Sequence, residues 1–189
     1  DGDLDLFTTQ DIYGIGVYYE NMGTADMPDY GPAQSNPFGT AAPTLGPRFF
    51  DFADLDNDGN LDILVAFGDD DNVAWYQNDG TGNFGPQQII TANAIGASSA
   101  AAGDFDGDGD LDVVSTSATD DKIAWYQNDG SGNFGPEQFI NISASTDEEV
   151  KVADINGDGA IEIISTGANQ ATGTDTYIGT GDAYAAANV

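Results

Sequence analysis

The sequence predicts an all-β fold, a β-propeller-like array of about four repeats of about 50 residues with acidic loops between strands. The segment AWYQNDGTGNFGPQQII at 74–90 returns as AWYQNDGSGNFGPEQFI at 124–140, and an acidic motif recurs at the same step. Short β-branched and aromatic runs separated by Asn/Asp-Gly turns are typical of strands and hairpins. One sheet cannot bury both of its faces alone, so neighbouring repeats are expected to stack.

The acidic motif marks the repeats. It reads DLDNDGNLD at 54–62, DFDGDGDLD at 104–112 and DINGDGAIE at 154–162, and the DGDLD at 1–5 matches its last five positions. We expect a single repeat domain over 1–189, with repeats at about 1–48, 49–98, 99–148 and 149–189. The first and last are expected to be incomplete. The first is truncated at its N-terminus and carries an insertion at 22–47 that reads as a surface loop.

The order of elements within each repeat follows from these patterns. The runs at 61–67, 111–117 and 161–167 are short and apolar, and each predicts a strand. A polar turn leads to NVAWYQN at 72–78 or KIAWYQN at 122–128, which predicts a hairpin. The NDGTGNF and NDGSGNF segments are expected to be ordinary hairpin turns into a further short strand. Each repeat therefore contains three or four strands.

The charge balance and the missing residue types exclude several functions. The chain has 33 Asp and Glu, 3 Lys and Arg, a net charge of -30, no Cys and no His. So few cations exclude nucleic-acid binding, and no apolar run is long enough for membrane insertion. The absence of His removes the commonest general base. The chain has enough hydrophobic residues, 40%, to form a packed core. Repulsion among its carboxylates opposes compaction unless cations bind.

The motif D-x-D-x-D-G-x-[LI]-[DE] has the chemistry of a calcium loop. Calcium takes six to eight oxygen ligands, and alternate side chains at positions 1, 3 and 5 can point inward together. Gly at position 6 allows a sharp reversal, position 7 offers its backbone carbonyl, and position 9 adds a carboxylate. Apolar residues at positions 2 and 8 are expected to anchor the loop to the core. A solvated turn is the alternative for one such loop, but repetition in register favours a metal.

These repeats resemble the FG-GAP/VCBS repeat family, whose members form β-propeller blades with a calcium loop between strands, as in the integrin α-subunit head. The resemblance implies three complete calcium sites and a fourth, partial one. The implied ligands are Asp54, Asp56, Asp58, Asn60 by its carbonyl and Asp62; Asp104, Asp106, Asp108, Asp110 by its carbonyl and Asp112; Asp154, Asn156, Asp158, Ala160 by its carbonyl and Glu162; and Asp1, Asp3 and Asp5. Asn156 removes one charge, so the third complete site is expected to be the weakest.

Two further features have weaker specificity. Trp75 and Trp125 are expected to pack in the core or between repeats, with stacking on a sugar as the alternative. Asn141 begins an Asn-Ile-Ser triplet, the N-glycosylation signal, which is common by chance.

These observations predict a calcium-binding structural or adhesive module of a secreted or cell-surface protein, and not an enzyme. The acids are absorbed by the repeated loops, whereas an active site usually breaks such symmetry. A carbohydrate-binding, lectin-like propeller is the alternative, and a polysaccharide lyase or hydrolase is a weaker one. The expected partner is a second copy joined head to tail in a filament, or a longer parent chain, with glycans or surface proteins as further ligands.

Overall fold

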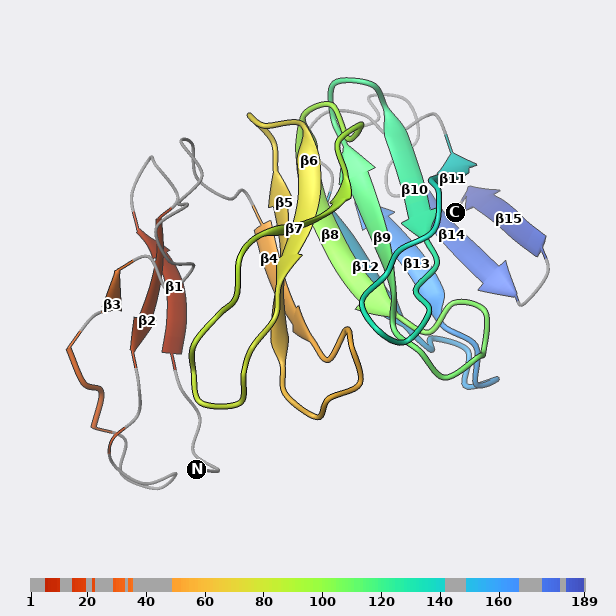
Figure 1. The fold of residues 1–189 in the computed structure, drawn as a ribbon. Helices are drawn as coiled ribbons and strands as arrows, with labels where there is room; N and C mark the ends of the chain where they lie inside the picture. Colours follow the sequence, from red (N-terminus) through yellow and green to blue (C-terminus); the bar gives the residue numbers. More distant parts are fainter. Residues whose placement is uncertain are drawn as a thin grey trace.

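The computed structural model describes residues 6–10, 15–19, 22, 29–32, 34–35, 49–141, 149–166, 175–180 and 183–188. All regular structure in these ranges is β-strand, which confirms the predicted all-β class (Figure 1). The described ranges accordingly hold no helix of the length and hydrophobicity that crossing a bilayer requires. The expected ligands Asp1, Asp3 and Asp5 and most of the 22–47 insertion lie outside these ranges.

In the part of the chain that the structure describes, fifteen strands form four antiparallel sheets, and the strands of each sheet are adjacent in sequence order. The sheets are β1 (Leu6–Gln10), β2 (Ile15–Tyr19) and β3 (Gln34–Ser35); β4 (Phe49–Ala53), β5 (Asp62–Phe67), β6 (Asn72–Tyr76) and β7 (Gln88–Thr91); β8 (Ala97–Gly103), β9 (Asp112–Ser117), β10 (Lys122–Tyr126) and β11 (Gln138–Asn141); and β12 (Glu149–Ala153), β13 (Glu162–Thr166), β14 (Asp175–Thr180) and β15 (Ala183–Asn188). The predicted strands are therefore present, and each sheet is an up-and-down meander like a propeller blade.

The β4–β7 and β8–β11 sheets repeat one another down to their irregularities. Leu64 pairs with Trp75 across β5 and β6, and Val114 pairs with Trp125 across β9 and β10. A register shift follows Val73 in one sheet and Ile123 in the other. The predicted NDG turns close with a single bridge, Asn78 to Phe84 and Asn128 to Phe134. The sequence repeat is therefore a structural repeat.

The first strand of each four-stranded sheet precedes the acidic motif and lies where neighbouring sheets meet. β8 packs against β4 and β5 on one side and against β12 on the other (Figure 1). Its sequence ASSAAAG holds only small residues, and six of its seven residues are buried. Small side chains let two sheets approach this strand closely, which explains a strand with low intrinsic β-propensity.

The core is shared between sheets. One cluster of buried residues joins Leu64 and Trp75 of the β4–β7 sheet to Val113 and Tyr126 of the β8–β11 sheet. A second cluster joins Val114 and Ile123 to residues of the following sheet, Val150 and Ile163. Hydrophobic burial therefore holds the sheets together as well as covering each one.

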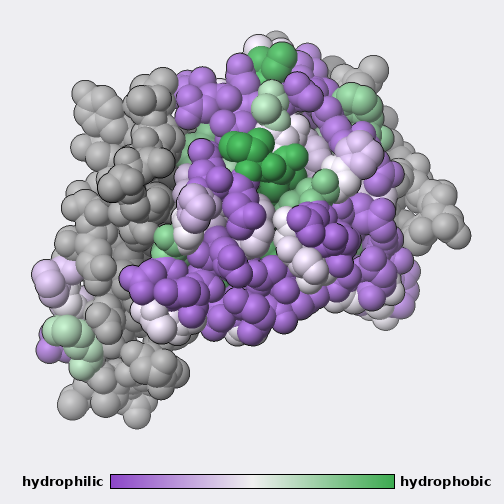
Figure 2. Space-filling model, viewed as in Figure 1, coloured by the Kyte–Doolittle hydropathy of each residue, from purple (hydrophilic) through white to green (hydrophobic). Residues whose placement is uncertain are grey.

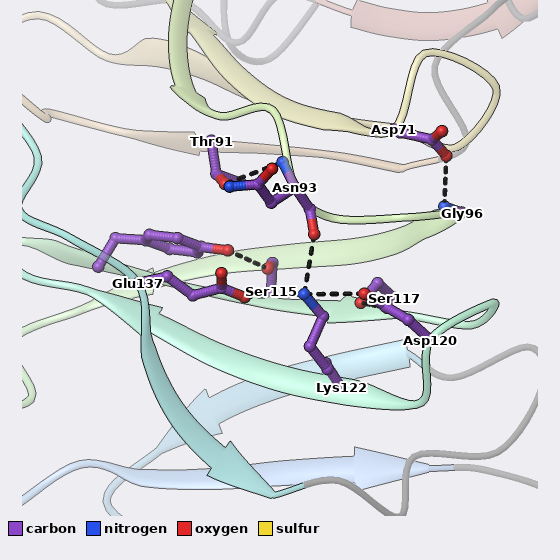
Figure 3. A network of polar contacts seen from close by, with 10 residues as sticks. Asp71, Thr91, Asn93, Gly96, Ser115, Ser117, Asp120, Lys122 and Glu137 are labelled. Carbon is purple, nitrogen blue, oxygen red and sulfur yellow. Dashed lines mark hydrogen bonds and ion pairs between the residues drawn. The ribbon is translucent and has the colours of Figure 1, made fainter.

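Lys122 organises a polar network at the border between β10 and the chain that precedes β8 (Figure 3). Its ammonium forms ion pairs with Asp120 at 2.8 Å and Glu137 at 3.0 Å, and donates a hydrogen bond to the Asn93 carbonyl at 2.9 Å. These carboxylates raise the pKa of Lys122 although partial burial opposes them. The face shown in Figure 2, which is the view of Figure 1, is mainly hydrophilic, with hydrophobic areas near its centre and at its upper edge.

Candidate metal centres

Each acidic motif is the loop that connects the first two strands of a four-stranded sheet. The last residue of each motif pairs across the hairpin with the residue just before the motif. These pairs are Ala53 with Asp62, Gly103 with Asp112, and Ala153 with Glu162. Eight residues are thus held between each pair of hydrogen-bonded residues, and every loop is anchored in the same way.

The loop backbone reverses at two left-handed positions. Position 6 is Gly59, Gly109 or Gly159, with φ of 91°, 97° and 93°, as the sequence predicts. Position 4 is also left-handed, and it was not singled out from the sequence. It is glycine in two loops and Asn57, with φ of 59°, in the other. Asparagine tolerates this region better than most residues.

The position-1 carboxylate fixes this backbone in all three loops. In the first loop Asp54 Oδ2 accepts a hydrogen bond from Gly59 N at 2.9 Å. Asp104 and Asp154 make the same contact with position 6 of their own loops, at 3.1 Å and 3.0 Å. Position 5 likewise accepts from the backbone N–H of position 7 in each loop, at 2.8 to 2.9 Å.

The loops bring acidic side chains together. Three groups each have one carboxylate oxygen per residue lying within 4.8 Å of the others: Asp54, Asp56 and Asp62; Asp104, Asp106 and Asp108; and Asp154, Asp158 and Glu162. Oxygens bound to calcium at about 2.3–2.6 Å lie no more than about 5 Å apart, so these groups fit a shared cation. Asp58 and Asp112 fall outside the groups although they belong to the same loops.

The position-9 acid is the buried member of each loop. Asp62 accepts hydrogen bonds from Leu55 N at 3.0 Å and from Asn78 N at 2.8 Å, one on each carboxylate oxygen. Asp112 repeats both contacts with Phe105 and Asn128. Burial raises the pKa of both carboxyls to about 6, against the opposing effect of these backbone hydrogen bonds. This acid therefore ties the loop to the end of the third strand, a role that the motif alone did not indicate.

The sequence also did not lead us to expect the glutamine that lies beside each of the first two loops. Gln77 Nε2 donates to Asp56 Oδ2 at 2.5 Å, and Gln127 makes the same contact with Asp106. Both belong to the repeated AWYQNDG segment, and each lies 21 residues after the position-3 acid that it contacts. This constant separation could have indicated the contact from the sequence. At position 7, the side chains of Asn60 and Asp110 lie against glycines of the following turn, where a Cβ would approach within 2.7 Å.

The first two loops are also connected to each other. Asn57 Nδ2 donates to Asp110 Oδ1 at 2.7 Å, across two sheets. The buried Asn128 donates to the Leu55 carbonyl at 2.7 Å and to the Leu111 carbonyl at 2.9 Å. The polar loops are therefore part of the junction between sheets as well as candidate ion sites.

The apolar residues at motif positions 2 and 8, which we expected to anchor each loop to the core, are buried in only some of the loops. Leu55, at position 2, is 1% exposed and packs in the cluster that includes Leu111, at position 8 of the next loop. Leu61 and Ile155 are each 58% exposed, so the prediction that positions 2 and 8 anchor every loop is wrong for these two. A position-2 residue is buried where the next sheet covers it, and no described sheet covers Ile155.

The remaining candidate residues have other surroundings. Trp75 and Trp125 are 2% and 8% exposed, so both indoles are core residues in this structure and neither offers a face on which a sugar could stack. Asn141 ends β11, but its side chain and the rest of the triplet lie outside the described residues. The NDG turns close on themselves: Asp79 accepts from Thr81 N at 2.8 Å and Thr81 Oγ1 at 2.6 Å.

Stacked four-stranded meanders with an acidic loop after each first strand define a repeat protein of the blade-forming class. The chain belongs to the FG-GAP-like repeat family, whose model matches residues 1–65, 54–115 and 104–165. No curated protein sequence matches the chain significantly.

One solved structure supports the fold. A lectin from Agrocybe aegerita, described for its specific recognition of non-reducing terminal N-acetylglucosamine, is similar with a TM-score of 0.65 and 22% sequence identity. The match covers 98% of this chain and 52% of the lectin, so the chain spans about half of that protein's length. The Vibrio cholerae biofilm matrix protein Bap1 matches with a TM-score of 0.46 and 18% identity, over 98% of this chain and 28% of Bap1.

Proposed function

We propose that this chain is a calcium-binding structural or adhesive module of an extracellular protein. The observation that carries the proposal is the threefold repetition of one loop, in which acidic oxygens converge within 4.8 Å at the same hairpin of successive sheets. The donors are all oxygens on tight loops, the ligand type that calcium selects. The family membership supports the extracellular setting. Calcium is abundant outside cells, so such a setting would also supply the ion.

The burial of the position-9 acids supports a bound cation. Asp62, Asp112 and Glu162 are at most 1% exposed, whereas Lys122 pairs with Asp120 and Glu137, and Lys151 pairs with Glu149. A buried carboxylate without a counter-charge is costly. A cation bound to each loop offsets that cost and the repulsion within a chain of net charge -30. Its binding free energy then contributes to folding.

Isothermal titration with calcium chloride tests the proposal. The wild-type protein should bind three or more ions, and Asp54→Asn should abolish or weaken one of them. Asp79→Asn is the matched control, because it removes one carboxylate from an exposed turn that lies outside the three groups. Absence of calcium binding at millimolar concentration, or an equal loss in both variants, would contradict the proposal.

The exposed apolar anchors favour self-association as part of this function. Between described sheets, position 2 of one loop meets position 8 of the next: Phe105 and Ile161 both lie within 3.4 Å of the Cβ position of Gly103. Ile155 and Leu61 are the exposed position-2 and position-8 residues of the third and first complete loops. A second copy of this chain, joined head to tail, would continue the same contact.

Light scattering across a concentration series in calcium tests this arm separately. Leu61→Asp and Ile155→Asp should each reduce the particle mass, because either removes one half of the contact. Ile89→Asp is the control, since Ile89 is also exposed, at 51%, but lies on β7 and outside the acidic motifs. A wild-type protein that stays monomeric would refute self-association and leave calcium binding intact. Because both indoles are buried, we assign no sugar-stacking function, and we propose binding without catalysis.

A further inference from the structure

Asn156 differs from its counterparts in a way that has a chemical consequence. It occupies position 3 of the third loop, where the first two loops have Asp56 and Asp106. It is followed by Gly157, and this is the only Asn-Gly pair in the 189 residues. Glycine lacks a Cβ, so its backbone nitrogen can approach the preceding asparagine side chain with little steric hindrance. The one loop that lacks the second acid therefore carries the dipeptide that most readily generates one.

Three hydrogen bonds of the loop involve the atoms that take part in that reaction. The backbone N–H of Gly157, the attacking group, donates to Asp154 Oδ1 at 2.7 Å. Asn156 Oδ1 accepts a hydrogen bond from Asp158 N at 2.8 Å, and a donor at this oxygen stabilises the negative charge that develops during attack. Asn156 Nδ2, the leaving nitrogen, donates to Glu162 Oε1 at 3.0 Å. Residues 154–159 are exposed, so water reaches the loop.

We propose that Asn156 is a site of spontaneous deamidation, which converts the third loop toward the acid pattern of the other two. The Gly157 nitrogen forms a bond to Asn156 Cγ and loses its proton to solvent. The Cγ–Nδ2 bond breaks, and the nitrogen leaves as ammonia after taking a proton from water. Water then opens the resulting succinimide at one of its two carbonyls and gives aspartate or isoaspartate. The net reaction consumes one water and releases one ammonia.

The two products have opposite effects on the loop. Aspartate keeps the backbone and adds a negative ligand at position 3, which strengthens cation binding. Isoaspartate inserts a methylene into the main chain before Gly157, and this displaces the N–H groups that Asp154 holds at positions 4 and 6. The effect on cation binding rests on the proposed function, whereas the deamidation itself does not. A cation held by Asp154 and Asp158 restrains the same backbone, so the reaction should be slower in calcium.

Peptide mass spectrometry of the full chain tests the proposal. The protein is incubated at pH 8 and 37 °C in EDTA or in calcium chloride, and the peptide spanning Asn156 is followed for a gain of about 1 Da, the replacement of an amide by an acid. We expect conversion at Asn156 in EDTA, at a rate at least equal to that of an unstructured peptide of residues 152–160, and slower conversion in calcium. Asn128, which precedes Asp129, is the internal control and should keep its amide.

Two variants separate the possible failures. Gly157→Ala should slow the conversion at least tenfold, and an unchanged rate, or an Asn156 that outlasts the free peptide in EDTA, would overturn the proposal. Asn156→Asp tests the consequence independently: calcium titration should show roughly tenfold tighter binding at one site. If Asn156 converts but Asn156→Asp binds calcium no better than the wild type, the modification stands and the calcium function of the third loop fails.

Discussion

Gly132 is the most sharply defined contact between neighbouring sheets. It lies in the NDGSGNF turn of the β8–β11 sheet, at φ of 72°, and a Cβ built on it would lie 2.3 Å from Trp75 Cζ2 and 2.7 Å from Cη2. Trp75 belongs to the preceding sheet and is 2% exposed, so its ring has no free space into which it can move. Gly132→Ala therefore perturbs the junction without touching any acidic loop.

The expected cost has two parts. An alanine in the left-handed region costs about 1–2 kcal/mol, and the clash with a fixed indole adds about 1–3 kcal/mol of overpacking. The control is Gly107→Ala, which has a φ of 78° and open space around its Cβ, and so should cost only the first part. For a chain of this length, 1 kcal/mol changes the melting temperature by about 2–4 °C. Gly132→Ala should therefore melt roughly 2–12 °C below Gly107→Ala.

The assay is thermal and urea unfolding of both variants in EDTA, so that ion binding does not contribute. Equal destabilisation by the two variants would show that the turn does not pack against Trp75. The stacking of sheets described above would then be wrong at its best-defined point.

Three further predictions concern the acidic loops and the Lys122 network. In EDTA, the pKa of about 6 for Asp62 and Asp112, against 3.8 for an unfolded aspartate, means that the native state binds more protons than the unfolded state between about pH 4 and 6. Stability is then lost as pH rises through this range, and each carboxyl should make the protein about 1 kcal/mol more stable at pH 5 than at pH 7; urea midpoints that fall on acidification would contradict this. Asn57→Gly keeps the left-handed backbone but loses the bond to Asp110, and should cost about 0.5–1.5 kcal/mol. Asn57→Ala should cost about 1 kcal/mol more than Asn57→Gly, because alanine is strained in the left-handed region. Equal urea midpoints for the two variants would contradict this strain. Lys122→Met removes the cation between two partly buried carboxylates and should cost about 1–2 kcal/mol, a loss that should shrink in 1 M salt if it is electrostatic.

The sequence predicted the elements whose signals are local. The runs that became β5, β9 and β13 are short and rich in β-branched and apolar residues, and the NDG turns need left-handed residues that only a few side chains supply. The repetition in register identified the acidic loops because a motif that recurs at the same step must serve the same place in each repeat.

The missed features depend on contacts between repeats. β8 has an alanine- and serine-rich sequence that favours no strand by itself, and it is one because sheets pack against both of its sides. Gln77 contacts Asp56 over a separation that only the folded hairpins bring together. The exposure of Leu61 could not be predicted either, because Leu111, at the same motif position, is covered by the preceding sheet. The motif predicted the conformation of the loop. The exposure of the loop residues depends on which sheet lies beside them.

Thermal unfolding in calcium and in EDTA tests most directly whether the loops are cation sites that hold the fold. Ligand at 100 times its dissociation constant stabilises by about 2.7 kcal/mol per site, so three sites contribute about 8 kcal/mol. That corresponds to a melting temperature roughly 15–30 °C higher in calcium than in EDTA. We predict an increase of this size for the wild-type protein, and a smaller one for Asp54→Asn. Superimposable melting curves in calcium and EDTA would contradict the assignment of these loops as metal centres.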